Sequence, residues 1–228
     1  MELKELKKIE NHKDSIFTLL LLYDGRLASS SGDKTIKIFS LINYACELTL
    51  KGHKDRVLCI AQLINYKIIS SSGDRTIKIW TISPFSYTCD FTIDDFTSAY
   101  INVLVVLPLN RFASSSINKT IKIWNSDPPY NLIKVLIGHT KKVKAMLKIK
   151  NNAQLLSASE DNTIRFWNIN TYQSNTIINK IFCSANKNMI EINDKQVAVG
   201  GKSIIQIINV IKYCVDYSIK DNCLEEMY

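Results

Sequence analysis

The sequence predicts an all-β protein built from about five copies of one four-stranded unit. One pattern, a Ser-rich strand followed by a turn and an alternating strand with an aromatic end, recurs along the chain. Its central Thr or Ser stands at positions 35, 76, 120, 163 and 203, so successive copies are 41, 44, 43 and 40 residues apart. A period near 40 residues indicates a repeated supersecondary unit, and the copies show no helical periodicity.

The second copy shows the order of elements most clearly. Residues 51–55 are polar and contain a glycine, so we expect a loop there. Short β-prone runs follow at 57–63 and 68–72, and a tight turn leads into residues 76–80, which alternate polar and apolar. With a fourth strand at about 87–93, the unit is a four-stranded antiparallel sheet, which is the blade of a β-propeller.

The other copies have the same order. Expected first strands lie at residues 16–21, 101–107, 143–147 and 181–185. Expected fourth strands lie at residues 3–9, 46–50, 132–136 and 176–180, and a last one lies at 213–219. We therefore predict one propeller domain over 1–228, with repeats at about 3–40, 46–81, 87–125, 132–168 and 174–210 and a C-terminal strand and tail at 211–228.

Five units leave the closure of the propeller open. A fourth strand is expected at both ends of the chain, so the ring would be incomplete, and exposed edge strands invite pairing with another chain. Three arrangements fit: a tight five-bladed ring, a truncated gene product, or an arc completed by a partner or a second copy. We expect truncation or completion by a partner.

The pattern resembles the WD-repeat (WD40-type) β-propeller family. The resemblance rests on Gly52-His53 and Gly138-His139, the Ser-rich second strand, the turn Asp and the Thr-Ile-Lys-Ile strand with its closing Trp. It covers essentially the whole chain, although no copy has the signature Trp-Asp dipeptide. The first copy has Asn11-His12 and Phe39, the third lacks the His, and the fifth lacks His, Asp and Trp together.

The resemblance implies that one His in each blade bonds a strand Ser and the turn Asp, with the Trp indole joining the same chain. Such a cluster holds a loop to the sheet because every buried donor meets an acceptor. The implied structural sets are His12, Ser29, Asp33 and Phe39; His53, Ser70, Asp74 and Trp80; Ser114, Asn118 and Trp124; and His139, Ser157, Asp161 and Trp167.

A catalytic interpretation of the same residues is weaker. Ser, His and Asp are the members of a hydrolase triad, but here they recur once per copy and are sealed by an aromatic residue. Single histidines in separate blades cannot converge on one zinc ion. We therefore predict no enzyme, no catalytic residue, no metal and no cofactor.

A partner-binding face is predicted where the family's loops emerge around the central channel. Exposed aromatic, Arg and Leu side chains around a concavity are typical of a hot spot. By repeat phase, this face would hold Ser15, Phe17, Arg56, Leu58, Tyr100, Asn102, Ile117, Lys142, Lys144 and Glu160. We expect a scaffold or adaptor in a larger complex that binds a peptide or a folded domain of another protein.

Charge and cysteine content add two expectations. The net charge of +8 favours an acidic partner, and the lysines at 141, 142, 144, 148 and 150 suggest an alternative function, binding of RNA or phosphoinositide phosphates. The six cysteines form no C-x-x-C pair, and the N-terminus has no apolar signal-peptide core. We therefore expect reduced thiols in the cytoplasm, with the nucleus as the alternative.

Overall fold

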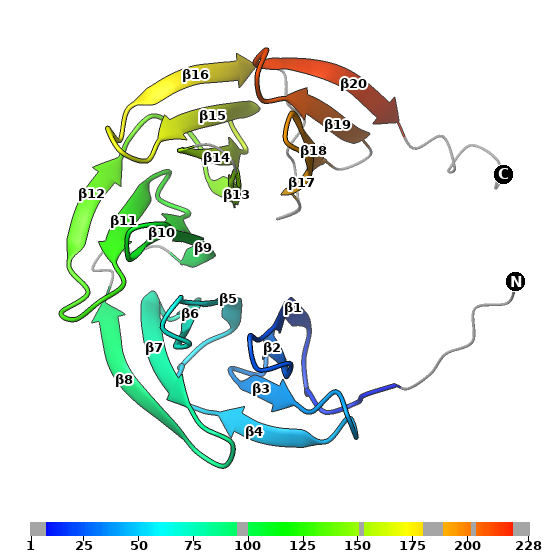
Figure 1. Ribbon diagram of the computed structural model, residues 1–228, viewed down its shortest axis with the longest axis vertical. Coiled ribbons are helices and arrows are strands. Elements are labelled where there is room, and N and C mark those ends of the chain that lie inside the picture. Colours follow the sequence, from blue (N-terminus) through cyan, green and yellow to red (C-terminus); the bar gives the residue numbers. More distant parts are fainter. Residues whose placement is uncertain (1–7, 95–99, 151–152, 180–188, 202–203, 221–228) are drawn as a thin grey trace, which may run out of the picture. The chain divides into compact units, whose positions relative to one another are not determined.

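The computed structural model describes residues 8–94, 100–150, 153–179, 189–201 and 204–220. The strands of these residues form five separate four-stranded antiparallel sheets, each with the strand order of a propeller blade (Figure 1). This confirms the predicted all-β fold class. Among the described residues there is no helix of the length and apolarity that a membrane span requires. The chain divides into two compact units, residues 1–96 and 97–228, which are described separately.

Unit 1 contains two sheets. The first sheet consists of β1 (Ile16–Leu21), β2 (Leu27–Ser31), β3 (Ile36–Phe39) and β4 (Cys46–Leu50), and the second of β5 (Val57–Gln62), β6 (Ile68–Ser72), β7 (Thr76–Ile82) and β8 (Tyr87–Asp94). Each strand pairs with its neighbour in the chain, because short turns join antiparallel strands directly.

Unit 2 contains three sheets of the same kind. The third sheet consists of β9 (Ile101–Leu107), β10 (Arg111–Ser116), β11 (Ile121–Asn125) and β12 (Leu132–Leu136). The fourth consists of β13 (Val143–Lys148), β14 (Gln154–Ser159), β15 (Thr163–Asn168) and β16 (Ser174–Asn179). The fifth consists of β17 (Met189–Asn193), β18 (Gln196–Gly200), β19 (Ile204–Asn209) and β20 (Cys214–Lys220).

Each sheet has two faces, which we name by the neighbour they contact. In the first sheet, Ala28, Ile36 and Ile38 pack against the second sheet, which meets them with Ile68 and Trp80. We call the face toward the next sheet in the chain the leading face, and the face toward the previous sheet the trailing face. The alternation of residues along each strand places one apolar set on each face.

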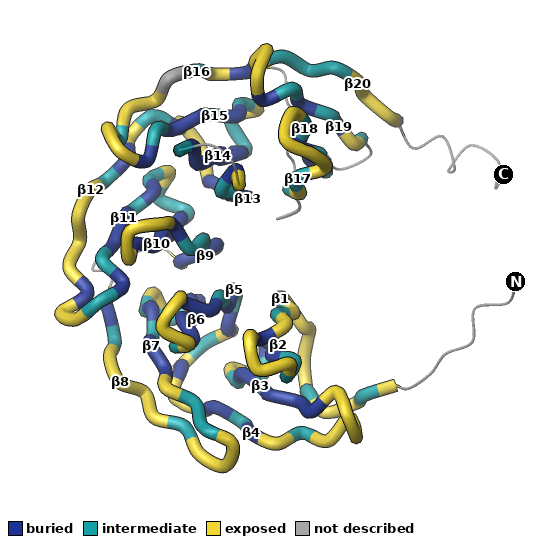
Figure 2. Tube along the Cα trace, in the orientation of Figure 1, coloured by how far each residue is buried: buried dark blue, intermediate teal, exposed yellow. Residues whose placement is uncertain are grey.

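The same pairing of faces builds the two cores of unit 2. Ile121 and Ile123 of the third sheet meet Leu155 and Trp167 of the fourth. Phe166 on the leading face of the fourth sheet belongs to the core that includes Val197, Val199 and Ile208 of the fifth. Burial is greatest in the second and third strands of the sheets, whereas the fourth strands are largely exposed (Figure 2).

The structure matches most expected strands and corrects three features. Residues 3–7 of the expected strand at 3–9 lie outside the described residues, and Lys8 and Ile9 are not in a strand. The expected strand at 181–185 also lies outside them, and the first strand of the fifth sheet is Met189–Asn193 instead. The single-domain assignment and the closure of the ring stay predictions.

The third correction concerns the alignment of the fifth copy. Val197 pairs with Ile208 and Gln196 with Asn209, as Leu155 pairs with Trp167 and Gln154 with Asn168 in the fourth sheet. By strand pairing, Ile208 therefore stands at the Trp position and Val199 at the Ser position. The sequence alignment missed this because the turn of the fifth copy is one residue shorter: Gln196 and Asn209 are 13 positions apart, whereas Gln154 and Asn168 are 14 positions apart.

Candidate functional site

Three sheets contain the chain of His, Ser and Asp side chains that the sequence predicts. In each, Nδ1 of the histidine faces an Asp carboxylate and Nε2 faces a Ser hydroxyl. The Nδ1–Oδ2 and Nε2–Oγ distances are 2.7 and 2.7 Å for His12 with Asp33 and Ser29, 2.9 and 2.7 Å for His53 with Asp74 and Ser70, and 2.8 and 2.7 Å for His139 with Asp161 and Ser157.

The indole nitrogens extend two of these chains and fix their direction. Trp80 Nε1 donates to Ser70 Oγ at 2.8 Å, and Trp167 Nε1 donates to Ser157 Oγ at 2.7 Å. Since this Ser oxygen accepts from the indole, its own hydrogen can go to the histidine Nε2, which leaves the Nδ1 proton for the carboxylate. With this direction of donation, every member of the chain has a hydrogen-bond partner.

Threonine is a further member that sequence reasoning missed. The Thr35, Thr76 and Thr163 hydroxyls donate to Oδ1 of the turn Asp at 2.6, 2.7 and 2.6 Å. Backbone N–H groups of the loop also reach these carboxylates, for example Lys54 N to Asp74 Oδ2 at 2.8 Å. The available signal was a Thr at one fixed phase in the first four copies.

These hydrogen bonds hold the turn aspartates ionised. Burial alone would raise the pKa of Asp161, but the hydrogen bonds from Thr163, the Thr140 N–H and His139 outweigh it and lower this pKa to about 2. The pKa of Asp74 falls for the same reasons. Burial lowers the pKa of His139, against the opposing effect of Asp161. In the fourth sheet the network is therefore most stable with an ionised Asp161 and a neutral His139.

The other sheets depart from this arrangement as their sequences do. Phe39 has no N–H to offer Ser29. In the third sheet, Trp124 Nε1 donates to Ser114 Oγ at 2.8 Å, while the Asn118 side chain accepts from the Thr120 hydroxyl at 2.7 Å. The fifth sheet places Val199 and Ile208 at the network positions, and both belong to an apolar core.

Packing explains why a glycine precedes two of the histidines. A Cβ atom on Gly52 would lie 3.1 Å from Cη2 of Trp80, and one on Gly138 would lie 3.1 Å from Cη2 of Trp167. The indole therefore packs against a bare backbone. Asn11 stands at this position in the first copy, where the smaller Phe39 replaces the Trp.

The network residues offer no surface to a substrate. The His53 and His139 residues are 7% and 6% exposed, and Ser70 and Ser157 are fully buried. The side chain of His12 is 3% exposed. Nucleophile and base are thus present in hydrogen-bonding geometry but closed from solvent, which is how a structural cluster and not a catalytic triad is placed.

A comparison with known proteins identifies the repeat. A family model for the WD domain, G-beta repeat, matches residues 3–40, 44–81 and 130–168, which together make up half of the chain. The chain belongs to the WD40 repeat family. Members of this family are generally non-enzymatic scaffolds for protein interactions.

Parts of the chain are similar to several known proteins. The chain is 30% identical over 116 residues to the WD repeat-containing protein 89 homolog of Dictyostelium discoideum, covering 50% of this chain and 30% of the relative. It is 42% identical over 57 residues to the nuclear distribution protein PAC1 of Coccidioides posadasii, covering 25% and 12%. It is 38% identical over 61 residues to the transcriptional corepressor LEUNIG_HOMOLOG of Arabidopsis thaliana, covering 26% and 8%. The chain thus spans less than a third of the length of these relatives.

One end of the WD40 sheets carries a row of β-bulges. The pairing of the first and second strands shifts register across Phe17, Leu58, Asn102 and Lys144 in the first four sheets. A bulge redirects a side chain out of the regular alternation. We call this end of each sheet, with its bulge residue and the adjacent loops, the bulge end. The sequence located these four positions by phase but had no signal for the bulges.

The bulge end also brings together the other predicted face residues within each sheet. Backbone N–H groups of the turn donate to carbonyls of the preceding loop: Gly32 to Ser15, Gly73 to Arg56, Ile117 to Tyr100 and Glu160 to Lys142, at 2.8, 2.9, 3.2 and 3.0 Å. Each sheet therefore presents a loop residue and a turn residue side by side. The first two of these hydrogen bonds lie in unit 1, and the last two lie in unit 2.

Exposure divides the predicted face residues into two groups. Ser15, Phe17, Arg56, Tyr100 and Lys142 are exposed. The rest are half-buried, and the side chains of three of them have partners: the Asn102 amide donates to the Val143 carbonyl at 3.3 Å, and Lys144 pairs with Glu160 at 2.9 Å.

The lysines of the fourth sheet do not form one patch. Lys141 and Lys142 precede β13, whereas Lys148 and Lys150 lie at its opposite end, about 20 Å away for a strand of this length. The Lys148 ammonium donates to the backbone carbonyls of Ile149 and Lys150. This separation does not favour a single phosphate site.

Proposed function

We propose that this chain is a non-enzymatic scaffold that binds a peptide or folded domain of another protein at its bulge ends. The observation that supports this is the exposure of Phe17 and Arg56 at the bulge end of unit 1. Aromatic and Arg side chains are the residues that most often dominate binding energy at protein interfaces. Phe17 lies in β1, and Arg56 directly precedes β5 with its carbonyl bonded to the Gly73 N–H, so both positions are tied to a sheet and little order would be lost on binding.

Charge suggests the chemistry of the partner. Arg56 in unit 1 and Lys141 and Lys142 in unit 2 are exposed cations at bulge ends, and the chain carries a net charge of +8. We infer a partner with carboxylates beside an apolar anchor. Cytoplasm or nucleus is the proposed location, since the four cysteines of the described residues are free thiols.

The names of relatives fit a scaffold role. Nuclear distribution protein and transcriptional corepressor are names of proteins that carry these repeats, and neither name denotes a reaction. For this chain, we infer a role as a scaffold within a larger protein assembly. Binding of RNA or phosphoinositide has no structural observation in its favour here.

The test compares two double variants of the full chain with wild type. We expect the double variant Phe17→Ala/Arg56→Ala to lose the proteins that wild type captures from native lysate. The matched control is Ile42→Ala/Phe85→Ala, which truncates two residues of unit 1 that are 96% and 94% exposed. The captured protein is then purified and titrated directly, and we expect at least about a tenfold weaker affinity for the double variant alone.

Two results would count against this proposal. Equal affinity for the double variant and wild type would remove the bulge end of unit 1 from the interface. An affinity that falls steeply with salt and is lost in Lys141→Ala/Lys142→Ala would instead support recognition of phosphate.

A further inference from the structure

The leading face of the fifth sheet is apolar and exposed. Ile205 and Ile219 are paired neighbours on β19 and β20 and are 47% and 57% exposed. Their counterparts in the first sheet, Ile36 and Leu50, are both 1% exposed, because the second sheet covers them. Ile190 and Tyr217 lie on the same face and are each 66% exposed. The fifth sheet therefore keeps the composition of a buried inter-sheet surface.

A tyrosine clasp joins neighbouring sheets within unit 2. The turn between the third and fourth strands holds Tyr172 in the fourth sheet and Tyr213 in the fifth, with φ of 60° and 54°. The Tyr213 hydroxyl accepts from Gln154 Nε2 of the fourth sheet at 3.0 Å, and its ring lies 4.9 Å from that of Phe166. The Tyr172 hydroxyl accepts from Arg111 of the third sheet at 2.7 Å.

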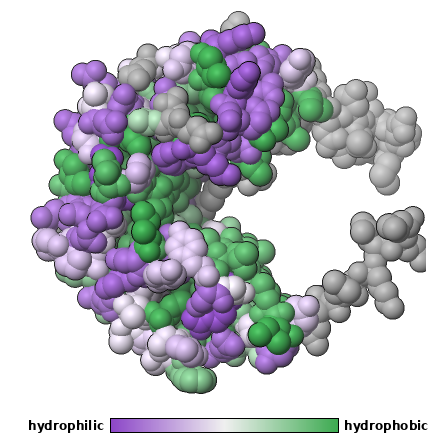
Figure 3. Space-filling model, in the orientation of Figure 1, coloured by the Kyte–Doolittle hydropathy of each residue, from purple (hydrophilic) through white to green (hydrophobic). Residues whose placement is uncertain are grey.

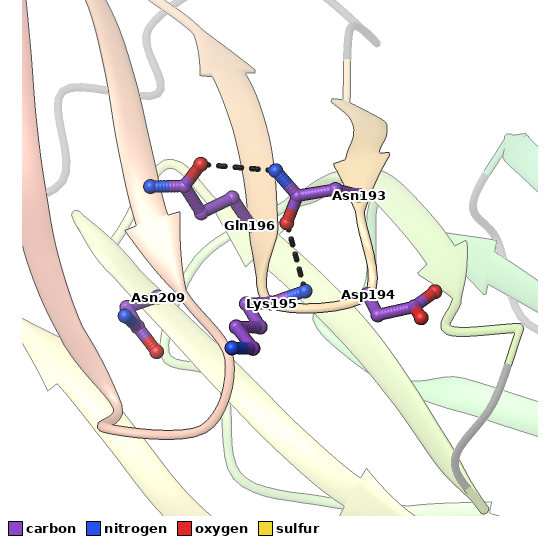
Figure 4. A pocket seen from close by; sticks show the side chains of 5 residues that line it. All are labelled: Asn193, Asp194, Lys195, Gln196 and Asn209. Atoms are coloured by element: carbon purple, nitrogen blue, oxygen red, sulfur yellow. Dashed lines mark hydrogen bonds between the residues drawn. The ribbon is translucent and has the colours of Figure 1, made fainter.

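The fifth sheet has the receiving half of this clasp. Gln196 pairs with Asn209 as Gln154 pairs with Asn168, so Gln196 stands where the next tyrosine would be bound. A cavity of about 550 Å³ opens there, lined by Asn193, Asp194, Lys195, Gln196 and Asn209. Asn193 Nδ2 donates to Gln196 Oε1 at 3.1 Å, and Asn193 Oδ1 accepts from the Lys195 N–H at 2.9 Å (Figure 4). One hydrogen of Gln196 Nε2 goes to Asp216 at 3.0 Å.

The first sheet has the inserting half. Tyr44 lies in its turn between the third and fourth strands with φ of 60°, the conformation of Tyr172 and Tyr213. Its hydroxyl has no hydrogen bond among the described residues. On the trailing face behind it, Ile16 and Leu19 are 52% and 62% exposed, whereas their counterparts Val57 and Ile60 in the second sheet are 0% and 3% exposed.

Apolar atoms accordingly show as green areas over β1 and near the end of β20 (Figure 3). Each unit thus has one exposed apolar surface of the kind that its other sheets bury. In unit 2 this surface is the leading face of the fifth sheet, beside Gln196. In unit 1 it is the trailing face of the first sheet, beside Tyr44.

We propose that the leading face of the fifth sheet binds the trailing face of the first sheet of a second copy of this chain. In this contact Tyr44 of one copy enters the cavity beside Gln196 of the other, as Tyr213 meets Gln154 within unit 2. The contact joins two different faces, so a dimer still has one free face at each end, and further copies can add. Self-association through this contact is a property separate from partner binding at the bulge ends.

The test uses two full-length variants, each of which disables one face. Tyr217→Glu/Ile219→Glu charges the leading face of the fifth sheet, and Ile16→Glu/Leu19→Glu charges the trailing face of the first. Phe85→Glu/Leu109→Glu is the control, since it charges two exposed apolar residues in turns of the second and third sheets, outside both faces. Circular dichroism checks that all are folded, and sedimentation velocity over a wide range of protein concentration gives the mass.

We expect wild type and the control to grow beyond the 26.0 kDa monomer as concentration rises, and each face variant alone to stay at 26.0 kDa. An equimolar mixture of the two face variants should form a dimer and nothing larger, because only one intact contact exists between them. Tyr44→Ala should raise the dissociation constant at least tenfold.

Three results would overturn the proposal. The first is a wild-type chain that stays monomeric at all concentrations. The second is a face variant that associates as strongly as wild type. The third is a mixture of the two face variants that remains monomeric.

Discussion

Neighbouring serines of one strand show how different the energetics of similar residues can be. Ser70 Oγ is shared by His53 and Trp80, whereas the Ser71 hydroxyl, on the opposite face of β6, has no partner in the described structure. Both residues are 0% exposed. The fourth sheet has Ala158 at the position of Ser71. The first serine is therefore needed for polar satisfaction, and the second is not.

Alanine substitutions should separate the two serines. Ser70→Ala leaves the His53 imidazole and the Trp80 N–H without their shared partner, so we expect the free energy of unfolding to fall by about 2–3 kcal/mol. Ser71→Ala removes an unpaired buried hydroxyl and should change it by less than about 0.5 kcal/mol, or raise it. Urea denaturation of both variants is the measurement. Equal losses would show that the network contributes nothing specific.

Titration of the same network predicts instability in acid. The pKa of Asp161 is lowered from 3.8 to about 2 in the folded chain, so its contribution to stability is complete above 3.8 and is lost as pH falls toward 2. The pKa of His139 is also lowered, from 6.5, so protonation below that value favours the unfolded chain. Both pKa shifts therefore make the folded chain less stable as the pH falls.

Melting temperature measured from pH 7 to pH 3 tests this prediction. We expect a continuous fall, and a smaller fall for Asp161→Asn, which has no carboxylate to protonate. A melting temperature that is constant or rises in acid would contradict the assignment of an ionised Asp and a neutral His.

At the scale of elements, the sequence predicted those parts that repeat without change. Strands such as 16–21, 46–50 and 101–107 have the predicted bounds, because alternation and turn residues agree there. The network partners share one phase, so their positions could be predicted from the resemblance. Bulges could not be predicted, since a bulge is a property of the pairing of two strands and leaves no mark on one of them. The clasp was missed because Tyr172 and Tyr213 meet a different sheet from their own.

The fifth sheet should be the least protected element of unit 2. It has Val199 and Ile208 in place of a hydrogen-bonded network, and its leading face is exposed. Fewer buried contacts lower the free energy of local opening. We expect backbone amides of β18 to exchange with deuterium at least about tenfold faster than those of β14, measured at a concentration where the chain is monomeric. Equal or greater protection of β18 would refute the comparison.

At the scale of the whole molecule, the repeats combine buried chemistry with exposed contacts. Nucleophiles, bases and indoles are enclosed in the sheets, whereas Phe17 and Arg56 are exposed at the bulge ends. The network thus serves to hold loops in place, and the held loops present Phe17 and Arg56. The enclosed Ser, His and Asp side chains therefore have a structural role, which fits the binding function proposed for this chain.

Site-specific photo-crosslinking tests that central claim most directly. A benzophenone amino acid is placed at position 17 in one full-length protein and at position 85 in another, and each is irradiated with the captured partner. The account predicts a covalent adduct from position 17 and none from position 85. An adduct from position 85 with none from position 17 would contradict it.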